Sequence, residues 1–453
     1  MLTLSAAAEK LRARRLSPVE LTEECLRAIE KLNPRLNAFV TVTADLAIEQ
    51  ACRAEVEIAA GNYRGPLHGI PIGLKDLFDT AGVRTTAASN QYRDRVPAQD
   101  AEVVRRLKEA GAVIVGKLNM HEFAFGMTGM VSAFGPTRNP WNTDCITGGS
   151  SSGSAAAVAA GLCIAALGSD TAGSNRAPQA LCGVVGHRPT ANLISLDGVV
   201  PLAPSFDTVG PAARTVEDAA LLMDVLADGS LCSQVEQDVS HLRVAIARAH
   251  FFDSLQPNVA SGVEDALSVV QTLTAEARDV TIPVDGFRTI FNAEIYEFHE
   301  QMANDTPELY DPRTLLRVRA CAKISAPDYI REQHRLAQFR VDAEKIFSDV
   351  DVVITPTVPI PAPRIADLEA LPINEARAFE VKYLMRNTAP FSSLFWPTIS
   401  VPCGFTSGGL PVGMQISARP GADGIVFSLA HKYQQATSWH KRRPDPILSK
   451  QAP

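Results

Sequence analysis

A stretch of small residues places the strongest constraint on how this chain can fold. Residues 148–173 are mostly glycine, alanine and serine. A backbone that carries such small side chains can approach a neighbouring backbone or a ligand closely. We therefore expect this stretch to pack tightly against other elements or against a ligand.

The segments around this stretch alternate between strand-like and helix-like patterns. Apolar runs at residues 70–74 and 112–115 lie on either side of a helical pattern at 101–110. Later strands are predicted at 242–247, 279–282, 351–354 and 398–401, and later helices at 258–275, 289–302 and 326–347. This alternation is typical of an α/β fold, and no linker divides the chain.

The first predicted helix has a clear start. Ser17-Pro18-Val19-Glu20 combines an N-cap serine, a proline at the first helical position and a capping-box glutamate. Pro34 is expected to end this helix. We predict a single domain over residues 1–453, with a helical segment at about 1–60, a catalytic core at about 61–225 and a variable, substrate-side part at about 285–395.

Composition excludes several classes of protein. The 453 residues are 46% hydrophobic and carry a formal net charge of −7, which argues against disorder and against a general attraction for nucleic acid or anionic membranes. The eight cysteines are scattered without a zinc-binding spacing, and residues 1–15 lack the apolar core of a secretory signal. We expect a cytoplasmic protein that contains no metal.

Three interpretations of the small-residue stretch can be weighed from its own residues. Residues 149–153 satisfy the G-x-S-x-G pattern of a nucleophile elbow, but the residues before them do not form the hydrophobic strand that an elbow requires. Residues 148–157 could instead bind phosphate at the start of a helix, although no Walker lysine follows. Simple tight packing of small residues is the third interpretation.

Two further segments favour catalysis. Lys75 ends the apolar run at 70–74, where it would be largely desolvated, whereas most lysines are solvated surface charges. Ser174 lies in a second small-residue loop, Gly168-Ser169-Asp170-Thr171-Ala172-Gly173-Ser174. In such a loop several consecutive backbone N–H groups can converge on one point, which is what an oxyanion needs.

Together these segments resemble the amidase signature family. The resemblance covers nearly the whole chain, and the spacings of 75 residues from Lys75 to Ser150 and 24 from Ser150 to Ser174 match the family's pattern. Its main motifs here are Gly69-x-Pro71-x-x-x-Lys75-Asp76, Gly148-Gly149-Ser150-Ser151 and Asp170-Thr171-x-Gly173-Ser174-x-Arg176-x-Pro178.

The resemblance implies a fold and a catalytic site. The fold is a single α/β domain with a central mixed β-sheet covered by helices on both faces. The implied triad is Ser174 as nucleophile, Ser150 as bridging serine after a cis peptide from Gly149, and Lys75 as base. The backbone N–H groups of Thr171, Ala172 and Gly173 would hold the oxyanion, with Ser151, Asp170 and Arg176 in support, and no cofactor is implied.

The chain departs from the family's pattern at a few positions. Ala172 replaces a glycine, Asn175 follows the nucleophile in place of an aliphatic residue, and Ser152 replaces a glycine. His187-Arg188 stands where Leu-Lys is common; like Ser152, this difference is expected to affect packing more than chemistry. Thr171-Ala172-Gly173-Ser174 is similar to the motif of allophanate-hydrolase-like members.

These observations predict an amidohydrolase that cleaves a small-molecule carboxamide to a carboxylate and ammonia or an amine. The alternatives are a glutaminase (A) subunit of an aminoacyl-tRNA amidotransferase and a hydrolase of a ureido or allophanate-like substrate. We expect a small-molecule partner, no direct contact with nucleic acid or membrane, and leave a homodimer open. Substrate choice is expected to depend on residues 287–395 and 125–130, with Tyr296, Tyr310, Arg313 and Tyr329 as possible lining residues.

Overall fold

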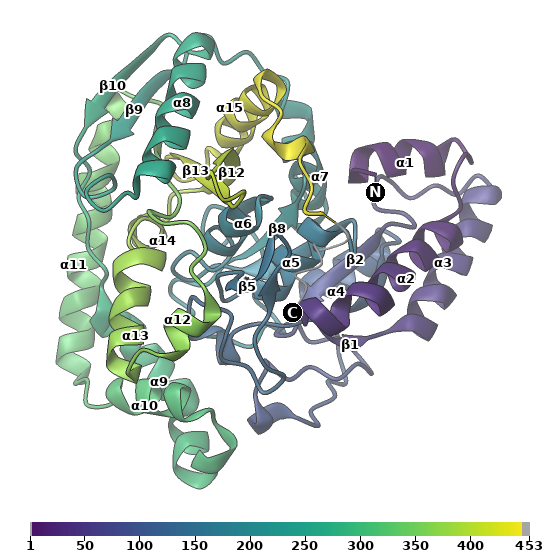
Figure 1. Cartoon of the computed structure of the whole chain (residues 1–453), viewed down its shortest axis with the longest axis horizontal. Helices are drawn as coiled ribbons and strands as arrows, with labels where there is room; N and C mark the ends of the chain where they lie inside the picture. The colour runs from purple at the N-terminus through teal and green to yellow at the C-terminus, as the bar shows by residue number, and fades with distance from the viewer. Residues whose placement is uncertain (1, 446–453) are drawn as a thin grey trace.

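One mixed β-sheet runs through the protein, as the computed structural model shows for the residues that it describes, 2–445 (Figure 1). Strand β2 pairs in parallel with β3 and β6, and β9 pairs in parallel with β10 and β11, while the remaining pairs are antiparallel. The order across the sheet is β1 (Phe39–Val42), β3 (Val113–Leu118), β2 (Pro71–Lys75), β6 (Ala165–Ser169), β8 (Val209–Ala213), β7 (Val185–Arg188), β12 (Thr398–Phe405), β13 (Pro411–Ala418), β11 (Val352–Pro356), β9 (Arg243–Ala247) and β10 (Glu276–Val280). A separate hairpin consists of β4 (Arg138–Asn139) and β5 (Asn142–Ile146).

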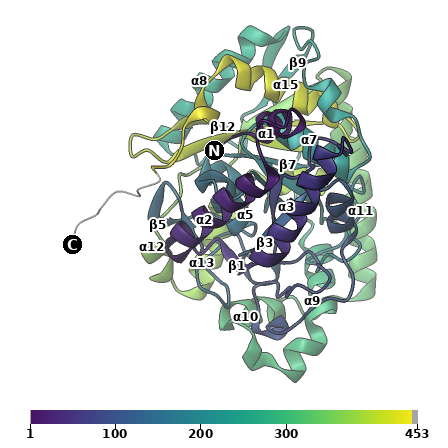
Figure 2. The ribbon, with the colours of Figure 1, turned by 90° about the vertical axis from the view of Figure 1, so that its right-hand side faces the viewer.

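Helices surround this sheet (Figures 1 and 2). They are α1 (Leu4–Arg12), α2 (Pro18–Leu36), α3 (Ala44–Ala59), α4 (Glu102–Glu109), α5 (Ser152–Ala160), α6 (Ala177–Cys182), α7 (Val216–Leu226), α8 (Pro257–Leu273), α9 (Arg288–Asp305), α10 (Pro312–Ala320), α11 (Ala326–Glu344), α12 (Ile365–Glu369), α13 (Ile373–Phe379), α14 (Ala389–Leu394) and α15 (Asp423–Ala436). A π-helical turn, Glu380–Leu384, follows α13. Short 3₁₀ turns lie at Asn90–Tyr92, Glu122–Ala124, Leu231–Gln234, Pro307–Leu309, Lys345–Ser348 and Trp439–Lys441.

Both faces of the sheet are covered, which confirms the predicted architecture. In β3, Val113 and Val115 pack into a cluster with α3 and α5, whereas Ile114 belongs to a cluster with α4 and α7. At the other end, Val353 of β11 packs with α14, and its neighbour Ile354 packs with α8. Because successive side chains of a strand point to opposite faces, this alternation requires apolar partners on both sides. Central strands such as β3 and β11 therefore consist of nearly continuous apolar runs, whereas the edge strand β10 is polar and largely exposed.

The N-terminal segment differs in two ways from the prediction. The Ser17 hydroxyl accepts the N–H groups of Val19 at 3.0 Å and Glu20 at 3.2 Å, as a helix N-cap should. However, α2 continues past Pro34 to Leu36 before Asn37 ends it in a left-handed conformation. Proline removes only one backbone donor, and in the last turn that loss does not stop the helix. Strand β1 also interrupts the segment that was expected to be helical, and Figure 2 shows α2 and α3 on either side of this break.

Two predicted strands have different bounds in the structure. Strand β12 continues through Pro402 to Phe405, and its register with β13 shifts between Pro402 and Gly404. This shift accommodates a residue that cannot donate to the ladder. Strand β10 lies at Glu276–Val280 rather than 279–282, because its parallel pairing with β9 begins at Glu276 opposite Arg243. Partner strands, which a local pattern does not contain, set both boundaries.

None of the helices within residues 2–445 combines the length and the apolar character that crossing a lipid bilayer requires.

Candidate active site

Lys75 is the last residue of β2, and all five residues of that strand are buried. Its side chain is fully inaccessible to solvent. Burial disfavours the ammonium and lowers the pKa of Lys75 to about 7. The negative charges of Asp170 and Asp207 act in the opposite direction and raise this pKa, but their effect is smaller than that of burial. Near neutral pH a substantial fraction of Lys75 is therefore uncharged and able to accept a proton.

Three serine hydroxyls surround the Lys75 amine. Its Nζ lies 2.7 Å from Ser150 Oγ, 2.8 Å from Ser169 Oγ and 3.0 Å from Ser151 Oγ. An ammonium would donate to all three hydroxyls, whereas a neutral amine has two N–H donors and one lone pair. The Ser151 hydroxyl is directed at the Ser169 carbonyl, 3.2 Å away. When Lys75 is neutral, the hydroxyl that donates to it is therefore that of Ser150 or Ser169.

Ser150 lies in the loop between β5 and α5. The peptide bond between Gly149 and Ser150 is cis, as the family resemblance implied. The Ser150 carbonyl accepts the backbone N–H of His121 at 3.1 Å, which holds this loop against the turn at Glu122–Ala124. Ser152, the residue that replaces a glycine, has its hydroxyl 3.1 Å from Thr137 Oγ1 and 3.3 Å from the Asn119 carbonyl, and its expected effect on packing stays a prediction.

Ser174 lies in the loop that joins β6 to α6. Its side chain is only 2% exposed, and within residues 2–445 the one hydrogen-bond partner of its hydroxyl is Met127 Sδ, at 3.6 Å. The Ser174 carbonyl accepts the Ser151 N–H at 3.2 Å, which ties the two serine loops together. The hydroxyls of Ser174 and Ser150 do not form a hydrogen bond here; catalytic contacts of this kind often tighten only when substrate is bound.

Asp170 organises the Ser174 loop from within. Its carboxylate accepts the backbone N–H groups of Gly173 at 2.8 Å and Asn175 at 3.1 Å, and two guanidinium N–H groups of Arg176, both at 3.0 Å. Burial by itself would raise the pKa of Asp170, but the charges of Arg176 and Arg188 hold it well below its usual value. This group is a buried ion-pair network, and a surface ion pair between Asp170 and Arg176 is excluded.

The predicted oxyanion donors are not equally available. The Gly173 N–H is already bound to Asp170. The N–H groups of Thr171 and Ala172 have no hydrogen-bond partner among residues 2–445. Their loop is held by the Thr171 hydroxyl, 2.5 Å from Asp207 Oδ1, and by the Ala172 carbonyl, 2.7 Å from Thr388 Oγ1. Two of the three predicted donors are therefore free to bind a ligand oxygen.

Sequence reasoning missed three residues that contact the site. Ser169 binds Lys75, Met127 covers the Ser174 hydroxyl, and Arg188 lies 3.3 Å from Asp170 Oδ1. Arg188 therefore does more than the packing role that was expected for it. Ser169 stands directly before the Asp170 motif, which was a usable signal. Met127 lies in the segment 125–130 that was expected to affect substrate choice, but nothing in the sequence singled out this residue, and nothing in the local sequence of Arg188 indicated a contact with the catalytic loop.

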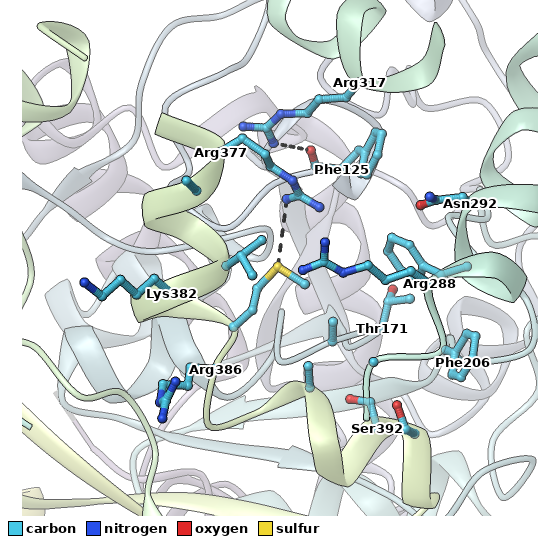
Figure 3. A pocket seen from close by; sticks show the side chains of 18 of the residues that line it. Phe125, Thr171, Phe206, Arg288, Asn292, Arg317, Arg377, Lys382, Arg386 and Ser392 are labelled. Carbon is cyan, nitrogen blue, oxygen red and sulfur yellow. Dashed lines mark hydrogen bonds between the residues drawn. The ribbon is translucent and has the colours of Figure 1, made fainter. Parts of the chain in front are cut away.

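A cavity of about 840 Å³ opens beside the catalytic loop, with Thr171 and Ala172 in its wall (Figure 3). Phe125, Phe206 and Phe291 supply aromatic surface. Most of the remaining lining comes from α9, α10, α13, the π-helical turn and α14. These elements lie within residues 287–395, the region from which substrate contacts were expected.

The four possible lining residues named within that region do not line the cavity. Tyr296, Tyr310, Arg313 and Tyr329 are absent from the cavity wall. The Tyr310 hydroxyl lies 2.8 Å from His299 Nδ1, Arg313 pairs with Asp311, and the Tyr329 hydroxyl lies 3.0 Å from Glu294. Tyr310 and Tyr329 therefore contact residues of α9, and Arg313 contacts the N-cap residue of its own helix, α10.

Comparison with known proteins gives a consistent result. The family model described as "Amidase" matches residues 20–427. The A subunit of the glutamyl-tRNA(Gln) amidotransferase of Carboxydothermus hydrogenoformans is 36% identical, over 96% of this chain and 97% of the relative. The solved peptide amidase from Stenotrophomonas maltophilia superposes with a TM-score of 0.84 at 28% identity, over 98% of both chains. The solved A subunit of the glutamyl-tRNA(Gln) amidotransferase from Thermotoga maritima has a TM-score of 0.81 at 32% identity, over 99% of this chain and 98% of its own.

Proposed function

Because the chain belongs to the amidase signature family and is a hydrolase of C–N amide bonds, we propose that it cleaves a carboxamide through an acyl-enzyme on Ser174. The observation that carries this proposal is the contact of 2.7 Å between the fully buried Lys75 Nζ and Ser150 Oγ. In this pair, Lys75 is a base whose pKa lies near neutrality, and the Ser150 hydroxyl can relay a proton to it.

The proposed reaction proceeds in two steps. Ser174 Oγ attacks the amide carbonyl carbon, its proton passes to Ser150 Oγ, and the Ser150 proton passes to Lys75 Nζ. The same relay then returns a proton to the leaving nitrogen, so that the C–N bond breaks and ammonia or an amine departs. Water, deprotonated through the relay, attacks the acyl-enzyme ester and releases the carboxylate and Ser174.

Charge develops on the carbonyl oxygen in both steps. The free N–H groups of Thr171 and Ala172 are the proposed donors to this oxygen, and the Asp170 network holds their loop in place. Loss of one such donor typically lowers turnover by ~10²–10³-fold. The buried Asp170 and Arg176 pair is therefore proposed as support for the oxyanion loop, without contact to the substrate.

A serine-directed fluorophosphonate tests the nucleophile. We expect the probe to label the wild-type protein on the peptide that contains Ser174, and the Ser174→Ala variant to lose the label together with amide hydrolysis. The exposed Ser233 offers a control, since Ser233→Ala should label like wild type. Label found on Ser151 would contradict the proposal and favour the nucleophile-elbow interpretation.

Two substrate classes remain for this chemistry. The first is a small-molecule carboxamide or ureido amide, for which the large cavity and the peptide amidase neighbour give support. The second is glutamine, with the chain acting as the A subunit of an aminoacyl-tRNA amidotransferase. The names of the curated relatives support this second class.

Reconstitution separates the two classes. A glutaminase component of such a complex should hydrolyse glutamine slowly when alone and faster when the remaining amidotransferase subunits and tRNA are added. An independent amidase should release ammonia from simple amides at a rate that these additions leave unchanged. A cytoplasmic location and a homodimer stay predictions.

A further inference from the structure

The cavity beside the catalytic loop carries far more positive than negative charge. Its wall contains five cationic side chains and a single carboxylate, Asp285. The cations are Arg288, Arg317, Arg377, Lys382 and Arg386. The whole chain has a formal net charge of −7, so this concentration of cations runs against the overall composition.

Internal carboxylates neutralise only part of this charge. The buried residue Glu380 accepts hydrogen bonds from Arg317 Nη2 at its Oε1, 2.6 Å away, and from Arg377 Nη1 at its Oε2, 3.2 Å away. A single negative charge is therefore shared by two guanidinium groups. Arg386 lies 3.3 Å from Asp253 and donates to the His250 carbonyl at 2.8 Å. The single carboxylate of the wall, Asp285, is itself paired with Arg335 at 3.0 Å.

Two of the five cations, Arg288 and Lys382, have no carboxylate within 4.0 Å among residues 2–445, whereas the other three are paired. Arg288 is the first residue of α9. Figure 3 shows the guanidinium groups of Arg288 and Arg377 approaching each other in the middle of the cavity, with Thr171 beneath them. Lys382 points away from this pair. Two like charges held close together destabilise each other, and an anion placed between them would remove that repulsion.

We propose that the substrate of this enzyme carries a carboxylate remote from the amide that is cleaved, and that this carboxylate binds between Arg288 and Arg377. The inference rests on the proposed function, since the amide carbonyl is placed at Thr171 and Ala172. The segment between the two groups would lie against Phe125, Phe206 and Phe291. An ammonium group would find no unpaired carboxylate in the wall, so the cavity disfavours amino-acid amides such as glutamine.

A series of matched amides tests this proposal. The ω-carboxy amides glutaramate, adipamate and suberamate are compared with the ω-hydroxy amides of equal chain length, and glutamine is compared with glutaramate, from which it differs only by its ammonium group. Ammonia release gives kcat/KM for each compound. We expect the best carboxylate to exceed its hydroxyl counterpart by about 10- to 100-fold, the value of one or two charge-assisted hydrogen bonds, and glutaramate to exceed glutamine.

Variants assign the preference to Arg288. In Arg288→Met the kcat/KM of the carboxylate amide, divided by that of the hydroxyl amide, should fall toward 1. Most of this fall should come from a higher KM for the carboxylate amide, because the lost contact is present in both the ground state and the transition state. Arg288→Lys should restore part of the ratio. Lys382→Met is the matched control, which removes a cation of the same cavity that points elsewhere and should retain the wild-type ratio. An unchanged ratio in Arg288→Met would overturn the proposal.

Two further measurements separate this inference from the proposed function. A wild-type ratio near 1 at every chain length, with clear turnover of the hydroxyl amides, overturns the inference and leaves the function standing. Calorimetric binding to Ser174→Ala measures the preference without turnover. If Ser174→Ala binds the carboxylate amide and Ser174→Ala/Arg288→Met does not, the inference is supported even if the nucleophile is misassigned. If Ser174→Ala binds the carboxylate amide and the hydroxyl amide equally well, the inference is overturned.

Discussion

Lys75 and Lys117 are both fully buried lysines, but their surroundings differ. Burial lowers the pKa of Lys117 to about 8, and its amine contacts Thr85 Oγ1 at 2.8 Å, Thr80 Oγ1 at 3.1 Å and the Phe78 carbonyl. No contact of Lys117 within residues 2–445 leads to Ser150 or Ser174. Burial therefore provides a lysine that can lose its charge, and only the serine contacts of Lys75 connect such a lysine to a nucleophile.

The pH dependence of the reaction should report Lys75. The base is the neutral amine, so activity is present above the pKa of about 7 and is lost as the pH falls through it. We expect kcat/KM to fall about tenfold per pH unit below the pKa and to level off above it, since a single proton is gained. Initial rates from pH 5.5 to 9, with circular dichroism as a check that the protein stays folded, measure this profile. A flat profile from about pH 6 to 9 would exclude Lys75 as the base.

The charge of Asp170 should be indispensable for stability. Asp170→Asn leaves Arg176 and Arg188 buried without a counter-charge, which typically costs about 3–5 kcal/mol. Urea unfolding measures the loss. Asp351→Asn is the control, because the Asp351 and Arg243 side chains are about a third exposed and such pairs contribute about 0–1 kcal/mol. Equal losses in the two variants would contradict the central role given to Asp170.

At the scale of elements, neighbouring parallel strands bring the catalytic groups together. Strands β2 and β6 pair in parallel with Leu74 opposite Leu167, so Lys75 and the end of β6 lie at the same edge of the sheet. Ligand sites in open α/β sheets lie beyond the carboxyl ends of the strands. The loop that follows β6 carries Ser174, and helix α5 follows Ser150. The parallel pairing thus explains how residues 99 positions apart in sequence share one site.

The connection from β6 to α6 should depend on Gly173. Its φ of +120° is unfavourable for other residues, and an added Cβ would lie 2.0 Å from Thr388 Oγ1, the hydroxyl that binds the Ala172 carbonyl. We expect Gly173→Ala to lower kcat/KM by about 100-fold, as small displacements of catalytic groups do. Steady-state kinetics on one amide measures the effect.

Gly61 provides the control for this prediction. It has a comparable φ of +88° with no atom within 4 Å of an added Cβ. Gly61→Ala should therefore cost about 1–2 kcal/mol of stability through its backbone alone and leave kcat/KM unchanged. If Gly173→Ala behaved like Gly61→Ala in both measurements, the close contact with Thr388 would have no catalytic importance.

At the scale of the whole molecule, the sheet joins the two halves of the chain. Strand β7 of the N-terminal half pairs with β12 of the C-terminal half, with Thr398 opposite Arg188. The largest apolar cluster likewise combines residues from α1 to α15. A continuous sheet and a shared core favour cooperative unfolding.

The single domain predicted over residues 1–453 can be tested by calorimetry. We expect one thermal transition, with a calorimetric enthalpy equal to the van't Hoff enthalpy. Asp170→Asn should shift this transition as a whole, because Asp170 follows β6 and pairs with Arg188 of β7, and both are inner strands of the sheet. Two separated transitions, or a shift of only part of the heat absorption, would indicate two domains.

The local sequence was sufficient for features whose causes are local. The N-cap at Ser17, the buried strand that ends at Lys75 and the serine loops at 148–151 and 170–176 are all evident from short sequence patterns. Hydrogen bonds between near neighbours and the apolar period of a segment determine such features. The helix end expected at Pro34 was wrong because a proline in the last turn removes only one donor. The strand end predicted at residue 401 was wrong because the register of β12 with β13 shifts after Pro402 and lets the strand continue.

By itself, the sequence determined the family, the fold class and the candidate catalytic residues, because these depend on residue types at characteristic spacings. Only the tertiary structure decided which side chains surround them. Ser169 and Arg188 contact the catalytic groups across the sheet, and Arg288 meets Arg377 across the cavity. The charge of a cavity is the sum over side chains from several helices, and that sum exists only once packing has brought the helices together.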